Sequence, residues 1–152
     1  MAHNEDTVRG QKRTGVDQTR EIYDLVQGFI GLLSPDGTLL DANQSALDFI
    51  GCDLDEVVGR PFWETPWWRA CSRTRETVKA AIQGCASGKA SRFEAQVCGK
   101  HDEIIDIDFS LTPIFNDDGT VVSLVPEGHD IKAIKKAENA LQESEAQLRL
   151  AY

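Results

Sequence analysis

The sequence has 152 residues and a net charge of −9, with 41% hydrophobic and 27% charged residues. These values are ordinary for a soluble globular protein of one domain with extra segments at its ends. Residues 1–20 and 132–152 each carry +1, which leaves −11 for the residues between them. Such an acidic surface repels nucleic-acid phosphates and anionic lipids, so we exclude nucleic acid and direct membrane contact as partners.

The cysteines and the lack of targeting segments bear on where the chain works. Four cysteines lie 13 to 19 residues apart without a CxxC pair, and no His, Cys and carboxylate cluster has the spacing of metal ligands. No apolar run approaches the ~20 residues of a membrane span, and no signal peptide is visible. We therefore expect a cytoplasmic chain without a metal site, whose reduced thiols pack as small side chains: Cys52, Cys71, Cys85 and Cys98.

The first part of the sequence predicts a lead-in followed by a short helix. Residues 1–17 are polar, mixed in charge and without periodicity, which predicts a flexible segment. Asp17 can cap the helix, and Ile22, Leu25 and Val26 share one of its faces. If the protein dimerises, we expect this apolar face to pack against the partner chain.

A β-hairpin is predicted next. Apolar residues 29–33 and 38–42 flank the turn Ser34-Pro35-Asp36-Gly37. A proline at the first central position and a glycine at the end suit a type I turn between two strands.

Two short helices are expected after the hairpin. Asn43 can cap the first, over residues 44–50, and Gly51 can end it. Asp53 opens the second, and Glu56 three residues later completes the pattern of a capping box.

A longer helix and three strands complete the predicted domain. Residues 72–86 have an amphipathic pattern, and residues 93–98 and 105–112 alternate between apolar and polar side chains. Residues 121–125 form the last predicted strand, after a turn at Asn116-Asp117-Asp118-Gly119. The order of elements predicts an α+β fold, in which a five-stranded antiparallel sheet has helices on its apolar face.

The C-terminal segment, residues 132–152, contains no glycine or proline and predicts one long helix. Its apolar and small residues follow the spacing of a coiled-coil seam over nearly three heptads. This seam is too short to hold two chains together alone, so we expect the start of a longer coiled coil. The predicted seam consists of Ile134, Ala137, Leu141, Ser144, Leu148 and Ala151.

Taken in order, these segments resemble a PAS domain with its C-terminal PAC part, the sensor module of bacterial signalling proteins such as histidine kinases. GFIGLLSPDGTLLDANQSALDFIG is similar to the first hairpin and helix of that family, and LDEVVGRPFWE to the helices that follow. IDFSLTPIFNDDGTVVSLVPEGHDI is similar to its last two strands, and Asp130-Ile131 matches the closing Asp-Ile-Thr, with Lys132 in place of the threonine. The resemblance divides the chain into a lead-in (1–17), a PAS domain with an N-terminal flanking helix (18–131) and a signalling helix (132–152).

The resemblance implies a regulatory, non-catalytic sensory and dimerisation module with a small pocket. Its partners would be a second copy of the chain, a small apolar ligand, and an effector domain in the same parent chain, which for this family is often a histidine kinase. Asp130 and Ile131 would transfer a change in the sheet to the coiled coil. The candidate pocket residues are Phe29, Phe62, Trp63, Trp67, Trp68, Ile107, Phe109 and Leu124.

All three tryptophans lie in the stretch GRPFWETPWW, residues 59–68, which in this family lies beside the pocket. In one interpretation Trp63 and one neighbour fill the core. In another they form an aromatic wall for an apolar ligand, with the indole N–H groups as polar contacts. In a third, Trp67 and Trp68 cannot both point inward, and one of them forms an exposed patch for a partner.

Cofactors can be compared with the residues that would hold them. The light-sensing branch of the family needs a cysteine just after the Gly-Arg pair, where this chain has Pro61-Phe62-Trp63. Among the histidines, only His129 lies where it could ligate a haem, and a solvated histidine is the simpler interpretation. Flavin bound without that cysteine stays an alternative, as does a constitutive dimerisation or docking module with no ligand.

No catalytic motif is apparent, neither a nucleophile with its base nor a phosphate-binding glycine loop. Asp106 and Asp108 share a strand face and resemble a carboxylate pair, but a solvated sheet face explains them better. We therefore expect a non-enzymatic module, with any kinase chemistry elsewhere in a longer parent protein.

Overall fold

The computed structural model describes residues 28–151 of the chain. The predicted lead-in and the flanking residues Ile22, Leu25 and Val26 lie outside the described residues, as does the side chain of Ala151. The predictions made for them therefore stay predictions.

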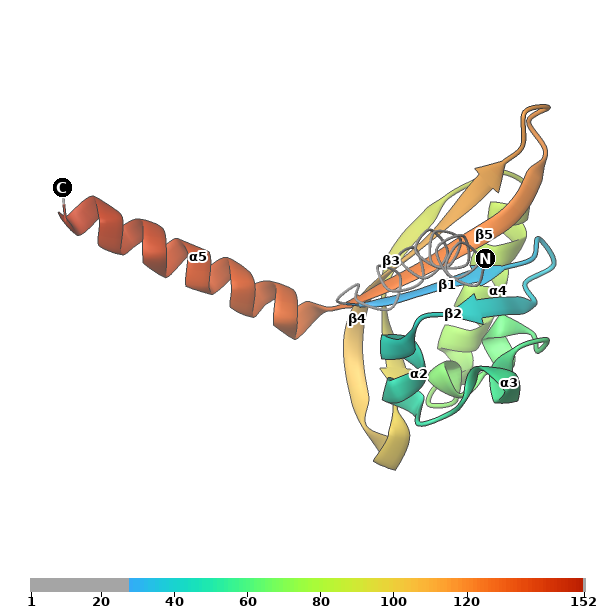
Figure 1. Cartoon of the computed structure of the whole chain (residues 1–152), viewed down its shortest axis with the longest axis horizontal. Helices are drawn as coiled ribbons and strands as arrows, with labels where there is room; N and C mark the ends of the chain where they lie inside the picture. The colour runs from blue at the N-terminus through green and yellow to red at the C-terminus, as the bar shows by residue number, and fades with distance from the viewer. Residues whose placement is uncertain (1–27, 152) are drawn as a thin grey trace, which may run out of the picture.

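The domain is built on one five-stranded antiparallel sheet with the strand order β2-β1-β5-β4-β3 (Figure 1). The sequence predicted this sheet and the order of its elements, and both are confirmed. The two strands that are adjacent at its centre, β1 and β5, come from opposite ends of the domain. The strands are β1 (Phe29–Leu33), β2 (Leu39–Ala42), β3 (Ser91–Cys98), β4 (Ile104–Phe115) and β5 (Val121–Asp130).

The helices between β2 and β3 lie against one face of the sheet, and the last helix extends away from the domain (Figure 1). Among the described residues, no helix has both the length and the apolar character needed to cross a bilayer. The helices are α2 (Gln44–Ile50), α3 (Leu54–Val57), the 3-10 turns η1 (Phe62–Glu64), η2 (Pro66–Trp68) and η3 (Lys100–Asp102), α4 (Ser72–Ala86) and α5 (Ile131–Ala151).

Local signals in the sequence explain where α2, α3 and α4 begin and which faces they bury. Asn43 caps α2 by accepting a hydrogen bond from the Ala46 N–H, and Glu56 accepts one from the Asp53 N–H, as a capping box requires. The predicted stripe of α4 packs into the core, with Val78, Ala81, Ile82 and Cys85 all buried. These predictions are confirmed.

The last strand is longer than the alternation of the sequence predicted. The residue pattern predicted a strand over residues 121–125 only. The structure continues β5 to Asp130, and its pairing with β4 runs without a break from Ile107 opposite Asp130 to Ile114 opposite Ser123. β5 therefore joins the centre of the sheet directly to the first residue of α5.

Pro126 leaves a gap in the pairing between the two central strands. Ile30 donates its N–H to Asn43 Oδ1 and accepts from the Asn43 N–H, so its backbone polar groups face β2. The groups of the next residue, Gly31, must then face β5. Ile30 pairs with Glu127 and Leu33 with Leu124, so continuing this register places Pro126 opposite Gly31. Pro126 has no N–H to donate to the Gly31 carbonyl.

Candidate functional site

An apolar cavity of about 30 Å³ lies between the central strands and the helices that cover them. On the sheet side, small residues and a proline line the cavity, namely Gly31, Pro126 and Gly128. On the helix side, Ala42 and Ala46 face the same space, together with the aromatic residues of η1 and η2. The cavity exists because these five positions lack side chains long enough to fill it.

Six of the eight residues predicted for a ligand pocket line this cavity: Phe29, Phe62, Trp67, Trp68, Ile107 and Phe109. Trp63 and Leu124 do not. Leu124 is fully buried in the core, and the partly buried Trp63 packs against that core. That the six residues contact a ligand stays a prediction.

Trp67 and Trp68 are both buried, so the interpretation in which one of them forms an exposed patch is wrong. Residues of a 3-10 turn project about 120° apart, which lets both side chains of η2 enter the core on different sides. In one interpretation Trp63 filled the core; it is half-buried and packs against the core cluster. It lies over Gly37, and the Lys79 Nζ lies 5.5 Å from the centre of its ring.

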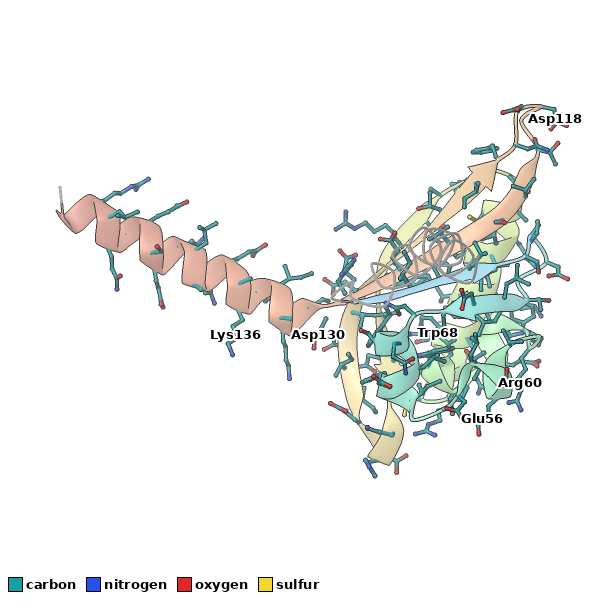
Figure 2. All side chains as sticks on the ribbon, viewed as in Figure 1. Glu56, Arg60, Trp68, Asp118, Asp130 and Lys136 are labelled. Atoms are coloured by element: carbon teal, nitrogen blue, oxygen red, sulfur yellow. The ribbon has the colours of Figure 1, made fainter. Side chains whose placement is uncertain are left out.

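The two buried indoles differ in their hydrogen bonding. Trp67 Nε1 donates to the Ala46 carbonyl at 3.0 Å, which ties η2 to α2. Trp68, labelled in Figure 2, is only 2% exposed, and its Nε1 has no hydrogen-bond partner. The Trp68 ring meets the rings of Phe62 and Phe109 edge to face, with centroids 5.5 and 5.3 Å away.

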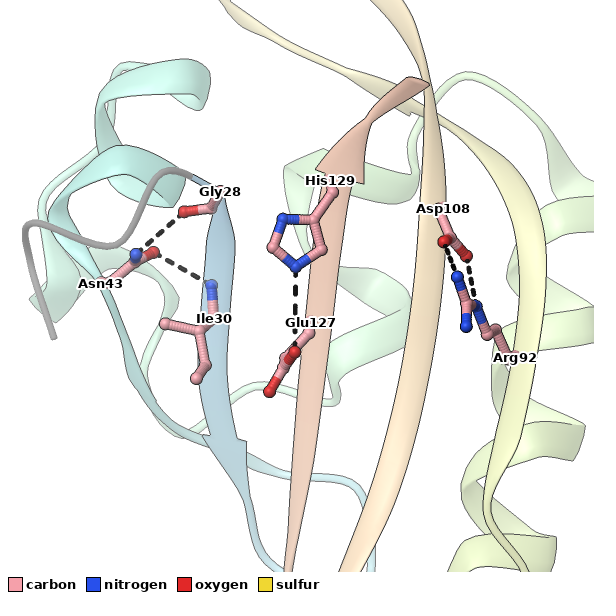
Figure 3. A network of polar contacts seen from close by, with 7 residues as sticks. All are labelled: Gly28, Ile30, Asn43, Arg92, Asp108, Glu127 and His129. Atoms are coloured by element: carbon pink, nitrogen blue, oxygen red, sulfur yellow. Dashed lines mark hydrogen bonds and ion pairs between the residues drawn. The ribbon is translucent and has the colours of Figure 1, made fainter. Parts of the chain in front are cut away.

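Asn43 ties the start of α2 to the start of β1, and Figure 3 shows its contacts with Gly28 and Ile30. Its side chain is completely buried: Oδ1 accepts from the N–H groups of Ile30 and Ala46, and Nδ2 donates to the Gly28 carbonyl. Gly28 in turn lies against His129 of β5. The sequence predicted Asn43 as a helix cap, but it gave no sign of the hydrogen bonds that join the Asn43 side chain to Ile30 and Gly28.

The opposite face of the sheet carries a small polar cluster (Figure 3). Arg92 forms an ion pair with Asp108, and its guanidinium hydrogen bonds lower the pKa of that carboxyl. His129 Nε2 lies 3.8 Å from Glu127 Oε2. The side chains of the cluster are partly or largely accessible to solvent, which agrees with a solvated sheet face for Asp108.

A haem or a flavin does not fit this site. The two histidines among the described residues lie outside the cavity, His101 in the exposed turn after β3 and His129 on the opposite sheet face. A cavity of about 30 Å³ has room for only a few non-hydrogen atoms, far fewer than either ring system contains. We therefore derive no step through such a cofactor.

The end of β5 forms the junction with α5. Asp130, the last residue of the strand, accepts a hydrogen bond from the Lys132 N–H at 2.9 Å and so caps the helix (Figure 2). Beyond Ile131 the side chains of α5 are exposed as far as residue 149, including the predicted seam residues Ile134, Leu141 and Leu148. A long helix with an unpaired apolar stripe is typical of a segment that pairs with another helix.

Comparisons with known proteins agree with this architecture. The profile of the PAS fold matches residues 23–135. The chain is 37% identical to the sensor histidine kinase TmoS of Ectopseudomonas mendocina, over 80% of this chain and 13% of that protein. It is 35% identical to hybrid signal transduction histidine kinase D of Dictyostelium discoideum, over 88% of this chain and 9% of that protein.

Solved structures show the same fold at lower sequence identity. The crystal structure of a PAS domain from Colwellia psychrerythraea superposes with a TM-score of 0.62 at 18% identity, covering 76% of this chain and 96% of that one. A five-stranded sheet of this topology with its helices on one face defines a sensory module of the PAS class. The match over most of its length shows that this chain belongs to the PAS family. It spans only a small part of the kinases to which it is similar.

Proposed function

We propose that this chain is the sensory and dimerisation module of a longer histidine-kinase-type signalling protein. Occupancy of the apolar cavity would shift β5, and β5 would pass that shift to α5. The observation that carries this proposal is that β5 both lines the cavity and leads directly into α5. Pro126 and Gly128 line the cavity, and Asp130, two residues further on, caps the helix.

Pairing of two α5 helices would turn this shift into an output. The exposed seam residues Leu141 and Leu148 are seven residues apart, as a coiled coil requires. A change in the direction or register of α5 at Asp130 would alter which seam positions of two chains face each other. An effector domain that follows the helix in the parent chain would read that change.

Cross-linking along α5 tests the proposal. The four native cysteines are first replaced by alanine, and the variant is checked for folding by circular dichroism. Leu141→Cys then places a thiol on the seam, and Gln142→Cys places one beside it as the matched control. We expect a disulfide dimer to form faster with Leu141→Cys. Equal rates for the two variants would contradict pairing through this seam.

A variant of β5 that partly fills the cavity tests whether the cavity and α5 are coupled. Gly128→Ala adds a methyl group 2.8 Å from Ile107 Cδ1, the free end of a flexible side chain that can move aside. Gly84→Ala adds the same group to α4, where nothing lies within 4 Å. We expect Gly128→Ala to change the rate of cross-linking at position 141 and Gly84→Ala to leave it unchanged. No difference between the two variants would count against coupling.

A constitutive dimerisation module without a ligand is the second candidate, and one observation favours it. Trp67 and Trp68 are buried in the core, and the cavity that they line is only about 30 Å³. Dilution in a sizing experiment separates the candidates. A docking module should stay dimeric on dilution and respond to no small molecule, whereas a sensor should change its cross-linking when the cavity is occupied.

A further inference from the structure

A polar group beside the cavity has no hydrogen-bond partner among the described residues. Trp68 lines the cavity, is 2% exposed, and its Nε1–H has no acceptor among the described residues. Buried donors of this kind are nearly always bonded, because burial removes their bonds to water. The neighbouring Trp67 follows this rule through its bond to the Ala46 carbonyl.

The carbonyl of Gly31, which also lines the cavity, lacks the donor that an uninterrupted ladder would supply, since Pro126 stands opposite it without an N–H. The other lining residues are apolar, apart from Glu127. The carboxylate of Glu127 lies on the other face of the sheet, near His129. A charged ligand would therefore find no counter-charge here, and its burial would be costly.

We propose that the cavity binds a small, uncharged carbonyl or hydroxyl compound, whose oxygen accepts a hydrogen bond from the Trp68 Nε1–H. This inference rests on the proposed function, because it takes the cavity to be the sensory site. The volume of about 30 Å³ limits the ligand to a few non-hydrogen atoms. A hydroxyl compound can in addition donate to the Gly31 carbonyl. The apolar walls select for size and lack of charge, and Trp68 selects for the oxygen.

Two probes of the same shape test the selection for oxygen. Acetone and 2-methylpropene share one branched skeleton, and only acetone carries an acceptor. The protein is labelled with ¹⁵N, and its indole N–H signals are assigned with single Trp→Phe variants. We expect acetone to move the Trp68 signal downfield, as a new hydrogen bond does, and to leave the signals of Trp63 and Trp67 in place. 2-Methylpropene should bind without this downfield shift.

The variant Trp68→Phe keeps an aromatic ring and removes the N–H. We expect it to weaken acetone binding several-fold and to change 2-methylpropene binding little, so the preference for acetone is lost. Trp67→Phe is the matched control, because it removes an N–H that is already bonded to the protein. It should lower the melting temperature and keep the preference for acetone.

Three results would overturn this inference. The preference for acetone could survive in Trp68→Phe. The Trp68 signal could lie upfield and stay there at saturating acetone, which would show that its N–H points at the face of Phe62 or Phe109. A magnetisation transfer from a resident water that no probe displaces would show that the cavity holds water only. None of these three results tests the cross-linking of α5. Probes that bind without changing the cross-linking of α5 would contradict the proposed function, but they would not contradict the role of Trp68.

Discussion

Replacing Asn43 by alanine should destabilise the domain more than its single side chain suggests. Asn43 is completely buried, and its amide joins three backbone groups, over 3.1 Å to the Ile30 N–H, 3.2 Å to the Ala46 N–H and 3.0 Å to the Gly28 carbonyl. Loss of a helix cap costs about 1 kcal/mol. A buried donor left without a partner costs about 1–3 kcal/mol. We expect Asn43→Ala to lower the free energy of unfolding by about 2–4 kcal/mol in total.

Urea unfolding followed by tryptophan fluorescence measures this loss, and the buried indoles of Trp67 and Trp68 provide the signal. Asn116→Ala is the matched control. Its side chain also accepts a backbone hydrogen bond, from the Thr120 N–H at 2.9 Å, but in an exposed turn that water can reach. We expect a loss below about 1 kcal/mol there. If the two variants lose equal stability, burial of the Asn43 side chain does not increase the free energy that its hydrogen bonds contribute.

Three further predictions follow from local geometry. Gly37→Ala should lower the melting temperature more than Gly59→Ala. Both residues have a positive φ (+90° and +84°), but only at Gly37 does the added methyl group approach a side chain, 2.7 Å from Trp63 Cζ3. Equal losses would show that backbone strain alone determines the loss of stability. The Arg92 hydrogen bonds lower the pKa of Asp108 below its unfolded value of about 3.9, so this contact stabilises the fold above that pH and is lost as the pH falls through the lower folded pKa. The difference in melting temperature between the protein and Asp108→Asn should be small, given the exposure of the pair, and it should begin to shrink below about pH 4 and vanish only below the folded pKa of Asp108. Hydrogen bonds from the Thr74 backbone and side chain lower the pKa of the half-buried Cys71 thiol, whereas burial raises the pKa of Cys85. Iodoacetamide should therefore modify Cys71 first and Cys85 only on unfolding, as mass spectrometry of the modified peptides would show. Early modification of Cys85 would contradict its burial.

Elements that depend on neighbouring residues in the sequence were predicted well. The capping box at Asp53 and the stripe of α4 are local patterns, and the alternation of β4 follows from its period of two. These patterns suffice for the sheet and its helical cover, because each element has one apolar face that can be buried in only one way.

The details of the cavity depend on contacts between distant residues and were predicted less well. The strand predicted over residues 121–125 stopped before Pro126 and Gly128, and the sequence does not show that β5 would lie at the centre of the sheet. The inward position of both Trp67 and Trp68 depends on the 3-10 geometry of η2, which no periodicity indicates in so short a segment. The aromatic residues could be assigned to the pocket because the resemblance to the PAS family places their segment beside it, whereas the small residues that create the space gave no such signal.

The gap opposite Pro126 gives a last prediction about how β5 can move. β5 stays paired with β4 along most of its length, but its pairing with β1 is interrupted at Gly31. A movement of β5 away from β1 at this point breaks fewer hydrogen bonds than a movement away from β4. A ligand that pushes against Pro126 would therefore move β4, β5 and the attached α5 as one unit relative to β1.

Pro126→Ala should close this gap, because the new N–H at position 126 faces the Gly31 carbonyl. We expect slow hydrogen exchange for that amide and a weaker response of α5 cross-linking to Gly128→Ala in the same background. Pro113→Ala on β4 is the matched control. The alternation of β4 directs its N–H toward β3, but β3 begins at Ser91, opposite Leu111, and supplies no partner at position 113. The new amide there should exchange quickly. Fast exchange at position 126 as well would refute the gap, and with it the reason why β5 should move together with β4 rather than with β1.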